Sequence, residues 1–219
     1  MKQSIQPDNV ILWIAEKDME LLPDSVTALL DHNSFEIRIY DDIGSYKKII
    51  PTLKLFPDAF IVTADDDLYY PHTWLEGLTK NWDSDYQNII GHRVHQIHMH
   101  DETTPCPYAE WDFDISKNQD KYFNFATGCG GVLYPPNAFD QRIIEQDIFM
   151  DICPNADDIW LFWMARLQGS YTSKSSYKMP LISWLRSQDV ALYHENLLNN
   201  KNDDRIQAMI NQFGWPSSK

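Results

Sequence analysis

Residues 60–71 read FIVTADDDLYYP, an apolar run that leads directly into three consecutive aspartates, Asp65, Asp66 and Asp67. The run favours a short buried strand, and Pro71 is suited to open a following helix, so the acids are expected at the carboxyl end of the strand. Open α/β sheets bind their ligands at that end. Adjacent carboxylates repel one another unless water or a cation separates them, and Mg²⁺ and Mn²⁺ prefer such oxygen ligands, shared with substrate phosphates. The stretch therefore predicts an α/β fold with a metal-diphosphate site.

The composition is that of an ordered globular chain. Its 219 residues, 43% hydrophobic and 13% aromatic, predict a single domain over residues 1–219. A net charge of -14 argues against a nucleic-acid partner. No apolar run approaches the roughly 20 residues of a membrane span, and residues 1–7 do not resemble a signal peptide, so a cytoplasmic location is expected. Cys106, Cys129 and Cys153 show no CxxC spacing, which favours free thiols.

The first half of the chain alternates between strand and helix patterns. Strands are expected at Val10–Ala15, Phe35–Tyr40 and Ala59–Ala64, and helices at Pro23–Leu30, Ser45–Leu55 and Pro71–Asn81. This order predicts a mostly parallel central sheet with helices on both faces. Further strands are expected at Asn88–Met99, Phe123–Tyr134 and Met179–Trp184, a buried helix at Ala156–Leu167, a final helix at Asp203–Phe213, and a loop at Thr103–Asp120.

A second acidic pair, Asp157 and Asp158, stands at the start of the expected buried helix. One interpretation is favourable placement of negative charge in the first helical turn. The other is a general base, since a carboxylate held on a helix terminus is rigidly aimed at an acceptor hydroxyl. The sequence leaves both open.

The glycine cluster Gly128-Cys129-Gly130-Gly131 interrupts an expected strand. It matches neither the dinucleotide-binding fingerprint nor the P-loop, so it indicates either a bulge or a close approach of the backbone to a ligand. In the histidine-rich strand, His98 and His100 are spaced as a zinc pair could be, but no closing ligand follows at a suitable spacing. We therefore do not expect a zinc site.

These motifs, taken in order, resemble the GT-A-fold nucleotide-sugar glycosyltransferases of bacteria. The matching residues are DDIGSYKKIIP at 41–51, IVTADDD at 61–67, Tyr70-Pro71 and Trp74-Leu75, Thr127-Gly128 with Gly130-Gly131, and ADDIWL at 156–161. The likeness runs from about Asn9 to Phe213 and is greatest to the family-2-like enzymes that build surface polysaccharide and lipopolysaccharide. The resemblance implies a GT-A-like sandwich that transfers a sugar from a nucleotide-diphosphate donor, with a UDP-sugar favoured, to a glycan or glycolipid acceptor.

The resemblance also assigns roles to individual residues. Asp65 and Asp67 match the ends of a DxD motif, with Asp67 favoured as the ligand of Mn²⁺ or Mg²⁺ and Asp65 or Asp66 near the ribose. Asp157 or Asp158 matches the catalytic base of inverting members. The remaining donor-binding candidates are Lys47 and Lys48 beside the phosphates, Gly130 and Gly131 along the sugar pocket, and Tyr108 and Trp111 as stacking surfaces. Peripheral association with the inner face of the membrane is compatible with such a function.

One feature departs from the family pattern. Its members open with a strand that embraces the nucleobase, followed by a helix, whereas residues 1–6 here resemble only the tail of that helix. The resemblance therefore implies an N-terminally truncated domain with an uncovered edge at Val10–Ala15, through which the chain would self-associate or bind a partner.

Two other classes of protein fit parts of the pattern. A phosphatase of the haloacid dehalogenase type also combines a DxD strand with a late Asp pair, although its nucleophile strand usually lies near the start of the domain. A catalytically inactive sugar-nucleotide or protein-binding module is the third alternative. Phosphate release from a generic phosphomonoester would favour the phosphatase, and UDP binding without turnover would favour the module.

Overall fold

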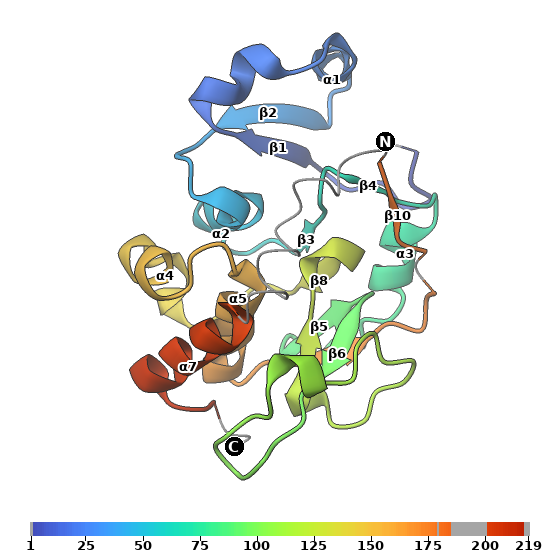
Figure 1. Ribbon diagram of the computed structural model, residues 1–219. Helices are drawn as coiled ribbons and strands as arrows, with labels where there is room; N and C mark the ends of the chain where they lie inside the picture. Colours follow the sequence, from blue (N-terminus) through green and yellow to red (C-terminus); the bar gives the residue numbers. More distant parts are fainter. Residues whose placement is uncertain (1, 179, 185–200, 217–219) are drawn as a thin grey trace.

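The computed structural model describes residues 2–178, 180–184 and 201–216 (Figure 1). Its strands are β1 (Val10–Ile14), β2 (Phe35–Ile39), β3 (Ile61–Thr63), β4 (Leu68–Tyr69), β5 (Asn88–Gly91), β6 (Val94–Gln96), β7 (Asn124–Ala126), β8 (Val132–Tyr134), β9 (Tyr171–Lys174) and β10 (Ile182–Ser183). Its α-helices are α1 (Asp24–Thr27), α2 (Ile50–Leu55), α3 (Trp74–Thr79), α4 (Gln146–Ile152), α5 (Asp157–Gln168) and α7 (Lys201–Phe213). Short 3₁₀ helices include η2 (Ala28–Asp31), η3 (Gly44–Lys48) and η6 (Gly128–Gly130). The protein is thus a mixed α/β structure with several small sheets.

The central sheet has the strand order β3-β8-β5-β9. β8 runs antiparallel to both β3 and β5, and only β5 and β9 are parallel. The expectation of a mostly parallel sheet is therefore wrong. Parallel neighbours need a long crossover, and the connection from β5 to the parallel β9 includes α5; β8 returns to the sheet after the β6–β7 pair and runs in the opposite direction. Apolar patterning predicts that a strand forms, and it does not predict its direction.

Two expected long strands are each broken into two. Asn88–Met99 forms β5 and β6, and Phe123–Tyr134 forms β7 and β8. Glycines stand at both breaks, and β6 and β7 leave the central sheet to form an antiparallel pair of their own. The last expected strand is confirmed as β10, apart from Met179, which lies outside the described residues. β10 pairs with β4, and neither β4 nor β9 was expected.

The expected helices form with altered boundaries; the last of them, predicted at Asp203–Phe213, is α7 and begins two residues earlier, at Lys201. The predicted helix Pro23–Leu30 is α1 followed by η2, and Ser45–Leu55 is η3 followed by α2. The break lies at Ile49, whose φ of -132° is not helical. α5 closely follows the prediction and is buried along most of its length. η3 and α5 provide the charged residues of the site described below.

Helices cover both faces of the central sheet, as expected. On one face, Trp74, Leu75 and Leu78 of α3 pack with Ile90 and Leu133. On the other face, the neighbouring residues Ile89, Val132 and Tyr134 join the core around α5. Successive residues of a strand point to opposite faces, which explains the division. Figure 1 shows α4, α5 and α7 gathered on one side of β8 and α3 on the other.

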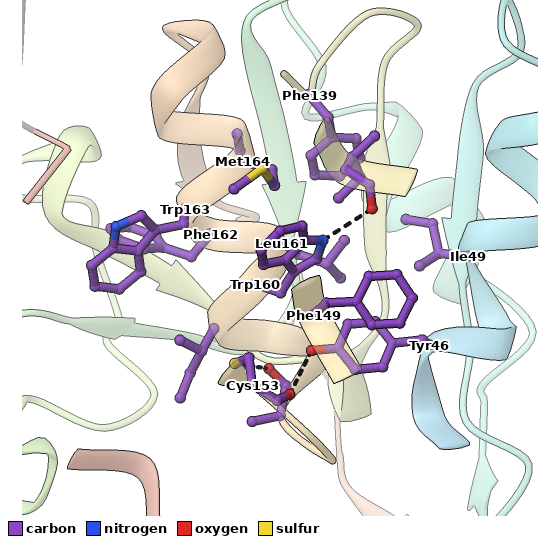
Figure 2. Close-up of a cluster of buried hydrophobic side chains, with 14 of the residues drawn as sticks. Tyr46, Ile49, Phe139, Phe149, Cys153, Trp160, Leu161, Phe162, Trp163 and Met164 are labelled. Carbon is purple, nitrogen blue, oxygen red and sulfur yellow. Dashed lines mark hydrogen bonds between the residues drawn. The ribbon is translucent and has the colours of Figure 1, made fainter. Parts of the chain in front are cut away.

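The larger core joins η3 to the turn between α4 and α5 (Figure 2). The Tyr46 ring stacks on Phe149 with ring centroids 4.1 Å apart, and its hydroxyl donates to the Cys153 carbonyl at 2.6 Å. The Trp160 indole N–H donates to the Ile143 carbonyl at 3.0 Å. These buried polar contacts fix the start of α5 relative to η3, because breaking them would leave polar groups unpaired in an apolar core.

β1 and β2 form a separate parallel pair. Although β1 is entirely apolar, four of its five residues are only half-buried, and among the described strands it pairs with β2 alone. Self-association, or binding of a partner, through the edge of β1 that faces away from β2 stays a prediction. Within the described residues, no helix is long and apolar enough to cross a bilayer.

Candidate functional site

The acid triplet lies in the loop that joins β3 to β4. The Tyr70 hydroxyl accepts a hydrogen bond from the Asp65 backbone N–H at 2.8 Å and donates one to the Cys129 carbonyl at 3.3 Å. Tyr70 thereby ties the acid loop to the glycine turn that precedes β8. Asp65 is half-buried, whereas Asp66 is exposed. The Asp67 carbonyl accepts from the Trp184 N–H at 2.9 Å, which connects this loop to β10.

Lys48, the last residue of η3, reaches two of the predicted acids. Its ammonium donates to Asp65 Oδ1 at 2.9 Å and lies 3.1 Å from Asp157 Oδ2. Its side chain is 20% exposed, against 25% for Asp65 and 9% for Asp157, so water screens the group only partly. Burial would lower the pKa of Lys48, but the charges of Asp157, Asp65 and Asp158 together raise that pKa well above its ordinary value. Lys48 is therefore a permanent cation at this site.

Asp157 and Asp158 occupy the first turn of α5, and the two carboxylates have different surroundings. Asp157 faces Lys48, while Asp158 Oδ1 accepts from the Gly128 N–H at 3.0 Å. Asp158 also lines a cavity of only about 10 Å³, with apolar neighbours such as Leu161 and Phe162. Burial, followed by the charge of Asp157, raises the pKa of Asp158 to about 7, although Lys48 opposes the shift. The Asp158 carboxyl can therefore take up or release a proton near neutral pH.

The glycine turn approaches these charges at Gly128. A Cβ at Gly128 would lie 2.9 Å from Lys48 Nζ and 3.2 Å from Asp158 Oδ1, so a side chain there would displace the ion cluster. The expected candidates Gly130 and Gly131 are buried elsewhere in the turn. The Gly130 carbonyl accepts from the Trp74 indole at 2.8 Å, and Gly131 has a φ of +94° and packs against the same ring. The glycine that faces the charges is therefore Gly128, and a role of Gly130 and Gly131 along a sugar pocket stays a prediction.

Three other predicted residues lie in different surroundings. Lys47 pairs with Asp42 at 2.7 Å. Tyr108 and Trp111 pack on each other, with ring centroids 4.7 Å apart, and both contact Phe125 of β7. Trp111 is 4% exposed, and its indole N–H donates to the Cys106 carbonyl. The structure therefore groups Lys48, Asp65, Asp157 and Asp158, and places Lys47, Tyr108 and Trp111 in contacts of their own.

Tyr70, Trp74 and Gly128 enter the sequence-based prediction only through the family resemblance, without a role at the site, and the sequence does not select Arg93. Tyr70 and Trp74 follow the acid triplet so closely that their proximity could have been inferred. Arg93 stands among histidines on an expected strand, where no local pattern separates it from a surface residue. Its guanidinium donates to Thr127 Oγ1 at 2.9 Å, beside Gly128.

A larger cavity, of about 670 Å³, lies beside the acid loop. Tyr70 and Trp74 line it, together with residues of the N-terminal segment such as Gln3 and Pro7. Its volume is in the range of small-molecule binding sites. Tyr70 is common to this cavity and to the acid loop, so a ligand in the cavity would contact the residue that holds Asp65.

Within the described ranges, no group of three or more His, Cys, Asp or Glu side chains is arranged to hold a metal ion. The acid loop nevertheless offers only oxygen ligands, which suits Mg²⁺ or Mn²⁺. Mg²⁺ is commonly held by one or two carboxylates and takes its remaining ligands from water and substrate phosphates. A preformed three-residue cluster is therefore not required, and the donor chemistry of Asp65 and Asp67 fits such an ion.

Comparison with known proteins finds no family model and no curated protein that matches this chain.

Proposed function

We propose that the protein is a glycosyltransferase that takes a sugar from a nucleotide-diphosphate donor, with a GT-A-like arrangement of its sheet and helices. One observation carries the proposal: Lys48, Asp65, the pair Asp157–Asp158 and Gly128 come from four separate segments and meet at the end of β3. The Lys48 ammonium and the backbone at Gly128 would bind a diphosphate, and the carboxylate of Asp157 or Asp158 would accept a proton.

In this proposal Lys48 contacts the donor phosphates and stabilises the negative charge of the leaving nucleoside diphosphate. Asp65 or Asp66 lies near the ribose, and Asp67 is the favoured ligand of Mn²⁺ or Mg²⁺, with Asp65 as the second. When bound, the ion would neutralise the leaving diphosphate as a Lewis acid. Asp65 accepts from Lys48, and Asp67 is preferred as the metal ligand because it matches the last acid of the DxD motif.

Asp158 is the better candidate for the general base. A base works best when its pKa lies near the operating pH, and burial raises the pKa of Asp158 to about 7. Asp157 faces the Lys48 ammonium, which favours a structural role in holding that cation. Asp158 would then take the proton of the acceptor hydroxyl, while the Gly128 N–H keeps its carboxyl oriented.

The acceptor in this proposal is a glycan or glycolipid of surface polysaccharide synthesis, with a UDP-sugar as donor. The reaction would take place in the cytoplasm or at the inner face of the membrane. Specificity for the sugar and the acceptor would come from the loops around the site.

The test is a calorimetric and kinetic screen of UDP-sugars with Mn²⁺ and with a chelator. We expect UDP to bind more tightly with Mn²⁺, and Asp67→Ala to abolish that difference while the exposed neighbour variant Asp66→Ala retains it. Asp158→Asn should reduce sugar transfer by about 10² to 10⁴ while UDP still binds. Equal UDP affinity with Mn²⁺ and chelator would contradict the metal role. Phosphate release from a generic phosphomonoester would instead indicate the phosphatase, and UDP binding without any transfer would indicate the inactive module.

A further inference from the structure

Arg93 is held firmly beside the glycine turn. It follows β5, and its carbonyl accepts from the Thr127 N–H at 3.0 Å. A Cβ at Gly130 would lie 2.8 Å from both the Arg93 backbone nitrogen and the Arg93 Cβ. The glycine therefore lets the Arg93 backbone pack directly against the turn.

The guanidinium of Arg93 is incompletely paired. Its Nη1 donates to Thr127 Oγ1 at 2.9 Å and lies 3.8 Å from Cys129 Sγ, both of them neutral groups. In the part of the chain that the structure describes, it forms no ion pair with a carboxylate. By contrast, Arg38 and Arg142 each pair with an acid at 2.6 Å. Arg166 also forms no ion pair among the described residues, but it is buried, donates to the Ser170 carbonyl at 2.6 Å and lies over the Tyr122 ring, whereas Arg93 is half-buried beside the glycine turn.

Arg93 and the acid cluster act on the same segment of the turn. Burial raises the pKa of the Cys129 thiol; the charge of Arg93 lowers it, and those of Asp158 and Asp65 raise it further. Lys48 approaches the turn at Gly128, one residue before Cys129. The turn is thus flanked by two cationic side chains, of which Lys48 is neutralised by carboxylates and Arg93 is not.

We propose that Arg93 binds a phosphate group of the substrate through the guanidinium N–H groups that it does not donate to Thr127 and Cys129. A guanidinium presents five donors in a planar fork that matches phosphate oxygens in pairs, which a lysine ammonium cannot do. Taking this phosphate as part of the donor diphosphate rests on the proposed function. A phosphorylated acceptor would supply the same chemistry, and the experiment separates the two sources.

The experiment measures binding by calorimetry to wild type, Arg93→Gln and Arg93→Lys, with Arg38→Gln as the matched control. The probes are pyrophosphate, UDP and uridine, followed by glucose 1-phosphate added to protein saturated with UDP. We expect Arg93→Gln to weaken pyrophosphate and UDP binding by about tenfold or more, the scale of a lost hydrogen bond to a charged group. Arg93→Lys should recover only part of this loss, and uridine binding and the Arg38→Gln control should not change. Thermal unfolding of each variant verifies that the fold is retained.

The pattern of affinities across these probes identifies which phosphate, if any, Arg93 binds. If only glucose 1-phosphate binding depends on Arg93, the phosphate site stands and belongs to the acceptor. If pyrophosphate binding depends on Arg93 but no nucleotide sugar is turned over, the phosphate site stands and the proposed function fails. Unchanged affinity of Arg93→Gln for every phosphate probe, or no phosphate binding by the wild type, would overturn the inference.

Discussion

Lys48 Nζ lies 3.1 Å from Asp157 Oδ2, although the two residues are 109 positions apart in sequence. The contact exists because the Tyr46 hydroxyl, two residues before Lys48, is bonded to the Cys153 carbonyl just before α5. The core thus aligns η3 with the first turn of α5. The same ammonium holds Asp65, so one cation joins the acid loop to the acid pair.

Replacing Lys48 with methionine should destabilise the fold more than the same change at its neighbour. Lys48→Met would leave Asp65 and Asp157 close together without a cation, at a cost of about 3 kcal/mol, as expected when one partner of a buried ion pair is removed. Lys47 pairs with a largely exposed Asp42, so Lys47→Met should cost less than about 1 kcal/mol. Urea denaturation measures both, and equal losses would show that the Lys48 cluster is no tighter than a surface pair.

Stability should depend on pH through Asp158. Its folded-state pKa is raised from 3.8 to about 7, so its stabilising contribution is complete below about 3.8 and is lost as the pH rises through 7. Asp158→Asn removes this titration while it keeps an acceptor for the Gly128 N–H. The unfolding free energy of the variant should therefore rise relative to wild type between pH 4 and pH 7.

The quantity to measure is the difference in unfolding free energy between wild type and Asp158→Asn at each pH. Other carboxyl groups make wild-type stability change with pH in the opposite direction. The pKa values of Asp83 and Asp140 are lowered by hydrogen bonds to Asn88 and Arg142, so their contributions are lost as the pH falls below the ordinary value of 3.8. These contributions cancel in the difference. Parallel stability profiles of wild type and Asp158→Asn from pH 4 to pH 7 would rule out a raised pKa at this position.

Gly131→Ala should be more damaging than an alanine at another glycine with positive φ. Gly131 has a φ of +94°, and a Cβ there would overlap the Trp74 ring. Gly214 has a φ of +73°, and nothing lies within 4 Å of the corresponding position. We expect a loss of about 3 kcal/mol for Gly131→Ala and about 1 kcal/mol for Gly214→Ala, since only the first adds a clash to backbone strain. Similar losses in denaturant melts would mean that the Trp74 ring moves aside freely.

Tyr70→Phe should loosen the acid loop. The Tyr70 hydroxyl is the acceptor for the Asp65 N–H, so its removal should cost about 1 to 2 kcal/mol of stability and weaken UDP binding. Tyr69→Phe is the matched control, because Tyr69 is 47% exposed and on β4 next to it. Denaturation and calorimetry test both effects. If the two variants lose stability and affinity equally, the hydroxyl of Tyr70 has no special role in holding Asp65.

The sequence by itself determined which residues form most elements and which of them carry the chemistry. The apolar runs predicted β1, β2 and β3, and the apolar circumference of α5 predicted its burial, because burial depends on side-chain character that is visible locally. The sequence also predicted Asp65, Asp157 and Asp158 as site residues from local information. Adjacent carboxylates repel one another, so they need solvent, a cation or a proton wherever they lie.

Only the tertiary structure decided how these elements combine. Strand direction depends on how the chain returns to the sheet, so β8 is antiparallel although its apolar pattern suited either direction. Nothing local separates Lys48 from Lys47, and the core contact of Tyr46 decides which ammonium faces the acids. The contacts of Gly128 with Lys48 and Asp158, and of Arg93 with Thr127, could not be predicted for the same physical reason. Their surroundings are made by segments distant in sequence, which are brought together by packing.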